Sequence, residues 1–110
     1  MDDARARELL AAERLRIEQA IASLSEQDAD DELQEVPGER GSEDLYEKEL
    51  AVGMEEDLAE QLAALERAEA RLAAGTYGLS VDSGQAIPDA RLEALPTAER
   101  TVEEQEVRGR

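Results

Sequence analysis

Two stretches of helical apolar spacing, separated by helix-breaking residues, constrain the fold of this chain more than any other feature. The apolar residues of the first stretch fall on one stripe of a helix: Leu10, Ile17, Ile21 and Leu24. Those of the second repeat on a heptad rhythm: Leu58, Leu62, Leu65 and Leu72. Pro37, Gly38 and Gly41 interrupt helix formation between the two stretches. An antiparallel coiled-coil hairpin buries both stripes, so the sequence predicts helices at about 2–27 and 44–74 around a polar tip at about 28–43.

The composition changes after the second stretch. Five turn-forming residues follow in close succession: Gly75, Gly78, Gly84, Pro88 and Pro96. This density of turns predicts a small cap in place of a continued helix, with one short helix from about Pro88 to Leu95. We expect the tail after Thr97 to add a last charged helical turn. The expected fold class is therefore mainly α, in two domains, a helical hairpin at 1–74 and a cap with its tail at 75–110.

The charge of the chain limits its partners. Its 110 residues include 29 acidic and 12 basic side chains, which gives a formal net charge of −17. Binding to DNA or RNA depends on Lys and Arg displacing counterions from phosphates, so we expect no direct nucleic-acid binding. A basic groove on another protein is the natural partner for such a chain. No apolar run reaches the length of a membrane span, and residues 1–7 lack a signal-peptide core, so we expect a soluble cytoplasmic protein.

The sequence contains no Cys and no His. Their absence removes disulfides, thiolate chemistry and the soft ligands that structural zinc requires. Carboxylates are numerous, but none falls in a recognisable acid–base arrangement with a nucleophile. We therefore expect that the protein is not an enzyme.

The cap contains residues at fixed intervals that resemble a known family. From residue 75 it reads Gly-Thr-Tyr-Gly-Leu-Ser-Val-Asp-Ser-Gly, followed by Ile, Arg-Leu and Pro at family spacing. This string resembles the DksA/TraR pattern, in which G-x-Y-G-x-C-x-x-C-G precedes I-x-x-x-R-L-x-A-x-P-x-A and then C-x-x-C. The residues that carry the resemblance form the expected scaffold of a zinc-finger-like cap: Gly75, Tyr77, Gly78, Gly84, Ile87, Arg91, Leu92 and Pro96. We expect positive backbone φ angles at Gly78 and Gly84.

The departure from the family pattern falls on the metal site. Ser80, Ser83, Thr101 and Glu104 stand where zinc-binding relatives carry cysteines. Neutral hydroxyls are poor zinc ligands, and a single carboxylate cannot hold the ion in a tetrahedral site. We predict a degenerate, metal-free site and no other cofactor. The serines are expected to act as turn residues whose hydroxyls bond backbone amides.

Apolar burial has to replace the metal in this interpretation. A structural zinc contributes on the order of 10 kcal/mol of apparent folding free energy in small modules. A fully buried apolar side chain contributes roughly 1.5 to 3 kcal/mol. The prediction therefore requires that most of six side chains lie inside: Leu79, Val81, Ile87, Leu92, Leu95 and Val102.

The resemblance implies a transcription regulator that binds RNA polymerase. DksA/TraR proteins insert the helical hairpin into the secondary channel of the polymerase, rest the cap on its rim, and modulate initiation without reading DNA sequence. Their tip carries aspartates in a D-x-x-D-x-A pattern that is not intact here. The candidates for polymerase-contacting groups are Glu39, Glu43 and Asp44, and ordinary solvated charges at a helix start are the alternative. An ungapped count back from Ser80 puts Arg40 near the second aspartate, so the alignment of the tip stays open.

Relatives that respond to guanosine tetraphosphate hold this alarmone with basic residues of the cap and the second helix. Here Leu95 precedes the family proline, and the region around Ala64 in the second helix is apolar. Arg91 remains, but it belongs to the R-L-x-A scaffold. The resemblance thus implies weak or absent dependence on the alarmone.

A hypothesis from another class stays open beside the regulator. An acidic coiled-coil adaptor, or a nucleic-acid mimic that occupies a basic groove, could keep this fold without polymerase activity. We expect a monomer, and a dimer would have to form through the stripe of Leu58, Leu65 and Leu72.

Overall fold

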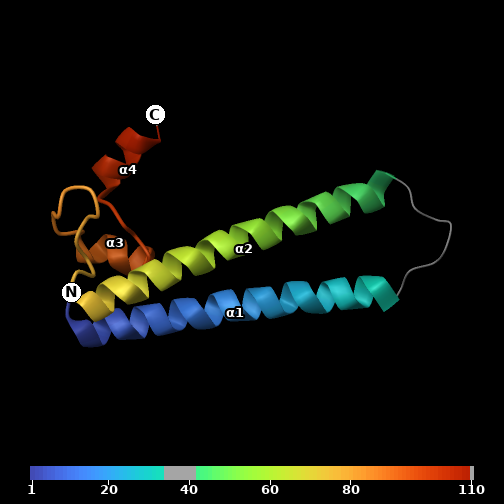
Figure 1. Ribbon diagram of the computed structural model, residues 1–110, viewed down its shortest axis with the longest axis horizontal. Helices are drawn as coiled ribbons and strands as arrows, with labels where there is room; N and C mark the ends of the chain where they lie inside the picture. Colours follow the sequence, from blue (N-terminus) through green and yellow to red (C-terminus); the bar gives the residue numbers. More distant parts are fainter. Residues whose placement is uncertain (34–41, 110) are drawn as a thin grey trace. The chain divides into compact units, whose positions relative to one another are not determined.

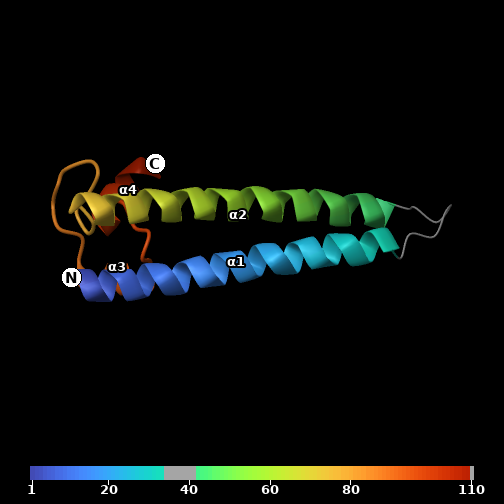
Figure 2. The same cartoon turned by 60° about the horizontal axis from the view of Figure 1, so that its bottom comes forward.

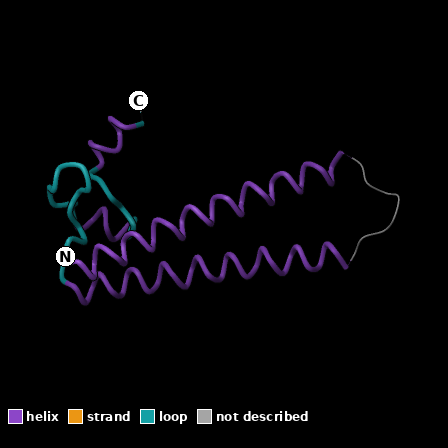
Figure 3. Tube along the Cα trace, in the orientation of Figure 1, coloured by secondary structure: helices purple, strands orange, loops and turns teal. Residues whose placement is uncertain are grey.

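The computed structural model describes the backbone of residues 1–33 and 42–109, and the side chains of residues 1–26 and 49–109. This part of the chain contains the helices α1 (Asp3–Leu33), α2 (Ser42–Ala74), α3 (Asp89–Ala94) and α4 (Val102–Arg108) (Figure 1). Among the described residues, β-structure is limited to one isolated bridge between Leu79 and Ala86, so Figure 3 shows helices joined by loops. The predicted fold class, mainly α, is confirmed.

The helices α1 and α2 run antiparallel in both views of the ribbon and form the predicted hairpin (Figures 1 and 2). The bounds of α2 lie close to the predicted 44 and 74, whereas α1 continues to Leu33, past the predicted end near residue 27. The sequence after residue 27 is mostly Asp, Glu, Ala and Leu, which a helix accommodates. Pro37 is the first residue of the sequence that a helix interior cannot accept. The polar composition after residue 27 therefore does not mark the end of α1.

The chain divides into two compact units that cut across both long helices. The cap unit consists of Met1–Arg14 and Ala63–Arg110, and the tip unit consists of Leu15–Leu62. The predicted boundary at residue 74 coincides with the end of α2. Each unit contains a piece of α1 and a piece of α2, so each has its own helical pairing to stabilise it.

The cap unit has two buried apolar groups. The first comes from the long helices: Ala6, Leu10, Leu65 and Ala68. The second comes from the segment after α2 and consists of Ile87, Leu92 and Ala98, with Tyr77 packed against it. Leu10 and Leu65 belong to the apolar stripes predicted from the sequence, and both are buried. The cap unit thus combines a helix–helix core with a small core of its own loops.

Specific hydrogen bonds close the start of α1 and the end of α2 in the cap unit. The side chain of Asp2 accepts from the backbone N–H of Arg5 at 2.7 Å and so caps the start of α1. At the end of α2, Gly75 has a φ of +79°, and the N–H of Thr76 donates to the carbonyl of Arg71 at 2.9 Å. This is a Schellman motif, in which glycine takes the left-handed position. Gly75 therefore ends α2 as the sequence predicted.

The tip unit has a thinner interior. Among its described side chains, Ile17 and Leu24 are buried, while Leu58 and Leu62 are half-buried. Several other large apolar side chains of this unit are exposed: Leu15, Leu50, Val52 and Met54.

No described helix of the chain is both long enough and apolar enough to cross a membrane.

Candidate functional site

The loop at 75–88 between α2 and α3 forms the first half of the candidate site. Within it, the N–H of Ser80 donates to the carbonyl of Gln85 at 2.8 Å, and the N–H of Gly84 donates to the carbonyl of Ser80 at 2.9 Å. Gly78 and Gly84 have φ angles of +86° and +74°, which confirms the prediction for both glycines. The loop therefore turns back on itself around Ser80.

The small core of the cap positions this loop. Ile87, Leu92 and Ala98 are buried together, and Tyr77 packs against them. The hydroxyl of Tyr77 donates to the carbonyl of Pro96 at 2.7 Å, and burial raises the pKa of this phenol. The residues of the predicted scaffold thus hold the loop against the segment that follows α3.

The start of α4 forms the second half of the site. Thr101 precedes the helix, and its hydroxyl accepts from the N–H of Glu104 at 3.2 Å. In return, the carboxylate of Glu104 accepts from the N–H of Thr101 at 3.1 Å. These reciprocal bonds make a capping box, which satisfies two backbone donors that a helix start otherwise leaves open.

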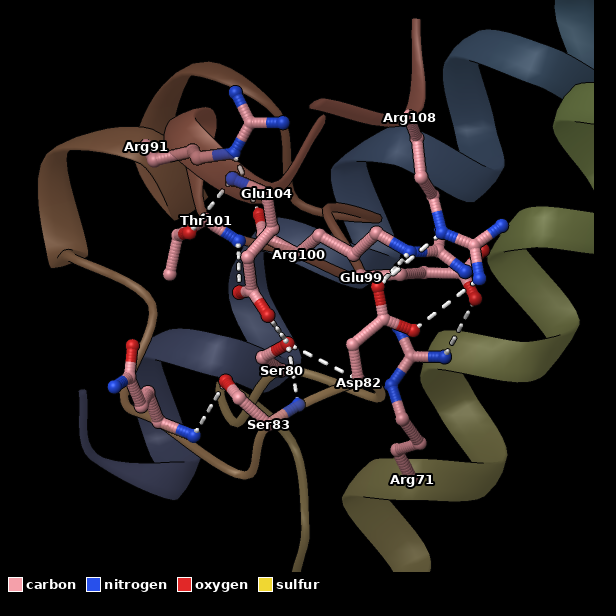
Figure 4. Close-up of polar contacts among 11 residues, drawn as sticks. Arg71, Ser80, Asp82, Ser83, Arg91, Glu99, Arg100, Thr101, Glu104 and Arg108 are labelled. Atoms are coloured by element: carbon pink, nitrogen blue, oxygen red, sulfur yellow. Dashed lines mark hydrogen bonds and ion pairs between the residues drawn. The ribbon is translucent and has the colours of Figure 1, made fainter. Parts of the chain in front are cut away.

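The two halves meet at the positions where zinc-binding relatives carry cysteines (Figure 4). The hydroxyl of Ser80 donates to Oε2 of Glu104 at 3.0 Å. The same oxygen of Ser80 accepts from the N–H groups of Asp82 and Ser83 at 3.1 and 3.3 Å. Ser80 and Thr101 are only 5% and 8% exposed. We call Ser80, Ser83, Thr101 and Glu104 the four-position network.

Hydrogen bonds set the charge of this network. The backbone N–H of Thr101 is the largest cause that lowers the pKa of Glu104, and desolvation acts against it. The hydroxyls of Ser80, Thr101 and Ser83 lower this pKa further. Because donors that bond the charged form of a carboxyl favour it, the geometry keeps Glu104 ionised at neutral pH.

A second carboxylate also connects the loop with the segment around α4. In this case the loop supplies the carboxylate, and the donors come from the other segment. Asp82, in the loop, contacts Arg100 at 2.8 Å and Arg108 of α4 at 3.2 Å. Both guanidinium groups lower the pKa of Asp82, with the hydrogen bond from Arg108 as the largest cause. The N–H of Val81 also donates to the carbonyl of Glu99 at 2.9 Å. The loop and the segment leading into α4 are therefore connected by backbone and side-chain contacts together.

Ion pairs and a scaffold hydrogen bond attach this segment to the rest of the cap unit. The carboxylate of Glu99 contacts Arg67 at 2.8 Å and Arg71 at 3.8 Å, both from α2. Arg91 of α3 donates from Nε to the carbonyl of Arg100 at 2.9 Å. Figure 4 shows Arg71 and Glu99 on the side of the site that faces α2. Arginine groups from α2 and α3 thus fix the segment that carries the second half of the four-position network.

The predicted apolar compensation for the missing metal is wrong for most of the side chains named. Ile87 and Leu92 are buried, but Leu79, Val81, Leu95 and Val102 are 39%, 46%, 45% and 44% exposed. The bridge at Leu79 makes this part of the loop extended, and neighbouring side chains of extended backbone point to opposite sides. Ser80 therefore takes the inward position, and Leu79 and Val81 point outward.

The segment that forms this site is also similar in sequence to known proteins. Residues 75–108 match the family model described as the prokaryotic dksA/traR C4-type zinc finger. In this segment the chain is therefore similar to the DksA/TraR family. The uncharacterized protein YteA of Bacillus subtilis (strain 168) is 42% identical over 62 residues, which are 56% of this chain and 26% of that relative. The chain thus spans about a quarter of the length of the curated relative it matches, and no solved structure matches it.

The four-position network does not fit a structural zinc. Both carboxylate oxygens of Glu104 already accept hydrogen bonds, from Ser80 and from the N–H of Thr101. The hydroxyl oxygens of Ser80 and Thr101 accept from backbone N–H groups. Zinc prefers thiolate, imidazole and carboxylate ligands in a tetrahedron, and three of these four side chains are neutral alcohols. Within the described residues, no group of three or more His, Cys, Asp or Glu could hold a metal ion.

The side chains of the tip candidates lie outside the described residues. Glu39 lies outside the described residues. Glu43 and Asp44 lie in the first turn of α2, where only the backbone is described. At the positions considered for the alarmone, Ala64 is half-buried and Leu95 is exposed, and neither carries charge.

Sequence reasoning missed the capping box and the ion pairs of the cap. The capping box has a sequence signal, because Thr101 and Glu104 stand in the pattern S/T-x-x-E. The comparison with the family pattern treats these two positions only as sites of lost metal ligands. The pairing of Asp82 with Arg100 and Arg108 has no such signal, since the partners are far apart in sequence. The serines do bond backbone amides, as predicted: Ser80 accepts from two N–H groups and Ser83 from the N–H of Gln85.

Proposed function

We propose that this chain regulates transcription by binding RNA polymerase through the secondary channel, and that it modulates initiation without binding DNA sequence. The observation that carries the proposal is the match of residues 75–108 to the DksA/TraR family, in a chain whose α1 and α2 form a helical hairpin. The proposal assigns no catalytic role to the chain, requires no cofactor and no second copy of it, and places the protein in the cytoplasm.

The charge of the tip unit supports a protein groove as the partner. Residues 15–62 include sixteen acidic and three basic side chains. Such a surface is repelled by nucleic acid and attracted by basic protein elements, and complementary charge speeds encounter between proteins. A channel lined by basic groups is a suitable partner for this half of the hairpin.

Direct binding to core RNA polymerase tests the proposal. The full-length chain is immobilised and incubated with purified core polymerase at low salt, with a zinc-containing DksA/TraR protein as the positive control. We expect stable association, and competition between the two regulators for one site on the polymerase. Absence of association under conditions in which the control binds would contradict the proposal.

The tip candidates are tested by a charge-matched pair of variants. The double variant Glu43→Gln and Asp44→Asn removes two charges from the start of α2. The control, Glu49→Gln and Glu56→Gln, removes two charges from exposed positions further along the same helix. If the tip acts on the polymerase, the first variant binds the enzyme but loses its effect on initiation in vitro, and the control keeps both. Equal effects of the two variants would assign Glu43 and Asp44 to general surface charge.

The proposed regulator depends weakly on guanosine tetraphosphate. Leu95 and Ala64 cannot form ion pairs with phosphate. We expect the same effect on initiation with and without the alarmone, while a responsive DksA/TraR control changes its activity in the same assay. A comparable response of this chain would contradict the expectation.

The acidity of the tip unit also favours a second candidate function. An acidic adaptor or nucleic-acid mimic would occupy a DNA- or RNA-binding groove of another protein without regulating polymerase. Cross-linking from the tip unit of the bound chain distinguishes the two. Cross-links to residues of the secondary channel support the regulator, and binding that DNA displaces competitively supports the mimic.

A further inference from the structure

Hydrogen bonds and ion pairs join two segments of the cap at the positions where zinc-binding DksA/TraR proteins carry their metal ligands. Glu104 of α4 accepts from the hydroxyl of Ser80 in the loop at 3.0 Å. Asp82 of the loop contacts Arg100 at 2.8 Å and Arg108 at 3.2 Å. Each segment therefore presents one carboxylate to a donor on the other.

We infer that the Glu104 carboxylate replaces the metal as the link between the loop and α4, so that protonation of this carboxylate, and not loss of a metal, loosens the cap. The inference concerns how the chain holds its own fold. It is independent of the proposed binding to polymerase.

The position of Glu104 explains why one side chain can serve as the link. One of its oxygens accepts from the hydroxyl of Ser80 in the loop, and the other accepts from the N–H of Thr101 at the start of α4. Removing the carboxylate leaves the buried hydroxyl of Ser80 without its acceptor and opens the capping box of Thr101. A buried polar group without a partner is costly, and so is the loss of a helix cap.

The sign of the pH dependence follows from the hydrogen bonds. They hold the pKa of Glu104 below its ordinary value of 4.5. A carboxyl whose pKa is lower in the folded state stabilises that state at pH values above its ordinary pKa. This stabilisation is lost as the pH falls through the lower pKa of the folded chain. The link is therefore complete at neutral pH and opens only in acid.

Other charged groups surround this link and must be separated from it. Asp82 has a lowered pKa as well, so its contacts with Arg100 and Arg108 also weaken in acid. Glu103 lies next to Glu104 in the first turn of α4, and its side chain is exposed. From α3, the guanidinium of Arg91 donates to the carbonyl of Arg100.

Amide hydrogen exchange on the full-length chain tests the inference. The protection factors of the backbone N–H groups of Thr101, Asp82 and Ser83 are measured by NMR from neutral pH down through the range in which glutamate titrates. In an Asp82→Asn background, which removes the second carboxylate, we expect protection to fall in acid. The added change Glu104→Gln should lower protection at neutral pH and remove its pH dependence, because the carboxylate is the titrating link.

The matched control is Glu103→Gln, which removes the same charge from the same turn of α4. Protection in this variant should follow the background at every pH. The inference is overturned if Glu104→Gln leaves the protection and its pH dependence unchanged, or if Glu103→Gln has the same effect as Glu104→Gln.

A metal-binding variant tests independently whether the network occupies the place of a metal site. The variant combines Ser80→Cys, Ser83→Cys, Thr101→Cys and Glu104→Cys, which restores the family ligands at the positions that the network brings together. We expect it to bind one equivalent of cobalt(II) with the visible absorption of a tetrahedral thiolate site, and the unaltered chain to show no such absorption. Failure of the variant to bind the metal, or stoichiometric binding by the unaltered chain, would overturn the inference.

Discussion

The cap unit and the tip unit both contain pieces of α1 and α2, but they differ in the balance of their acidic and basic side chains. The cap unit, residues 1–14 and 63–110, has thirteen acidic and nine basic side chains, and many of these form specific pairs. Arg14 donates to Glu69 at 3.0 Å, and Arg5 donates to Glu93 at 2.8 Å. The tip unit has sixteen acidic and three basic side chains. One unit uses charge to hold its fold, and the other carries an excess of charge that its own residues cannot neutralise.

This difference predicts that substitutions in the two units have different effects. The cap unit buries Leu92 and Ile87 and contains a hydrogen-bonded network in which Ser80 and Thr101 are buried. The tip unit leaves Leu50, Val52 and Met54 exposed, and its sequence carries an excess of acidic side chains. We therefore expect substitutions in the cap unit to change the free energy of unfolding strongly. Changes in the tip unit should act mainly through electrostatics and partner binding.

The largest effect is expected in the small core of the cap. Leu92→Ala removes a side chain that is 1% exposed, so the free energy of unfolding of the cap unit should fall by about 2 to 5 kcal/mol. Leu95→Ala, at a position that is 45% exposed, is the control and should change it by about 0.5 kcal/mol or less. Urea unfolding followed by the NMR signals of the cap measures both. Similar losses in the two variants would show that the cap has no defined interior.

The next effect compares two serines at metal-ligand positions. Ser80→Ala removes a buried hydroxyl that accepts from two backbone N–H groups and donates to Glu104, and should cost about 1 to 3 kcal/mol. Ser83 is exposed, and Ser83→Ala should cost much less. Chemical unfolding of the two variants under identical conditions gives the difference. An equal cost would contradict the assignment of Ser80 as the inward member of the network.

Salt should affect the two units in different directions. On α2, Glu56 and Glu60 stand four positions apart, a spacing at which like charges repel. Raising the ionic strength screens this repulsion and should stabilise the tip unit by about 1 kcal/mol in total. The same salt weakens the ion pairs of the cap unit slightly. Amide exchange at low and high salt, measured for both units in one sample, reports the contrast, and parallel changes in the two units would contradict it.

The smallest effect is a gain of stability in the tip unit. Gly53 lies inside α2, and a Cβ at this position would meet no atom within 4 Å. Gly53→Ala should therefore stabilise the tip unit by about 0.4 to 1 kcal/mol through its higher helix propensity. Amide exchange in the tip unit should slow while exchange in the cap unit stays the same. A loss of helical protection around position 53 would contradict the prediction.

The sequence predicted the features that repeat or that depend on local backbone preference. The apolar stripes gave the hairpin, and Gly75 marked the end of α2 at Ala74. The short helix expected near Pro88 to Leu95 is α3, and the helical turn expected in the tail is α4. These predictions succeed because periodicity and turn chemistry act over a few neighbouring residues.

The features that the sequence did not predict depend on contacts between distant residues. The bond between Ser80 and Glu104 joins positions 24 residues apart, and periodicity carries no information about such a pair. The exposure of Val81 and Val102 follows from the direction in which an extended loop and a helix start present their side chains. The candidate site could therefore be located from the family spacing, while the way it holds together could not.

The most direct test of the central claim, that hydrogen bonds and not a metal hold the cap, is the amide protection of Ser80, Thr101 and Glu104 before and after treatment with a strong zinc chelator. The chain is prepared in the presence of zinc, so that any site able to take the metal is filled. We predict that the protection of these three N–H groups is the same with and without the chelator, because their partners are protein atoms. A loss of protection on chelation, together with release of one zinc per chain, would contradict the account.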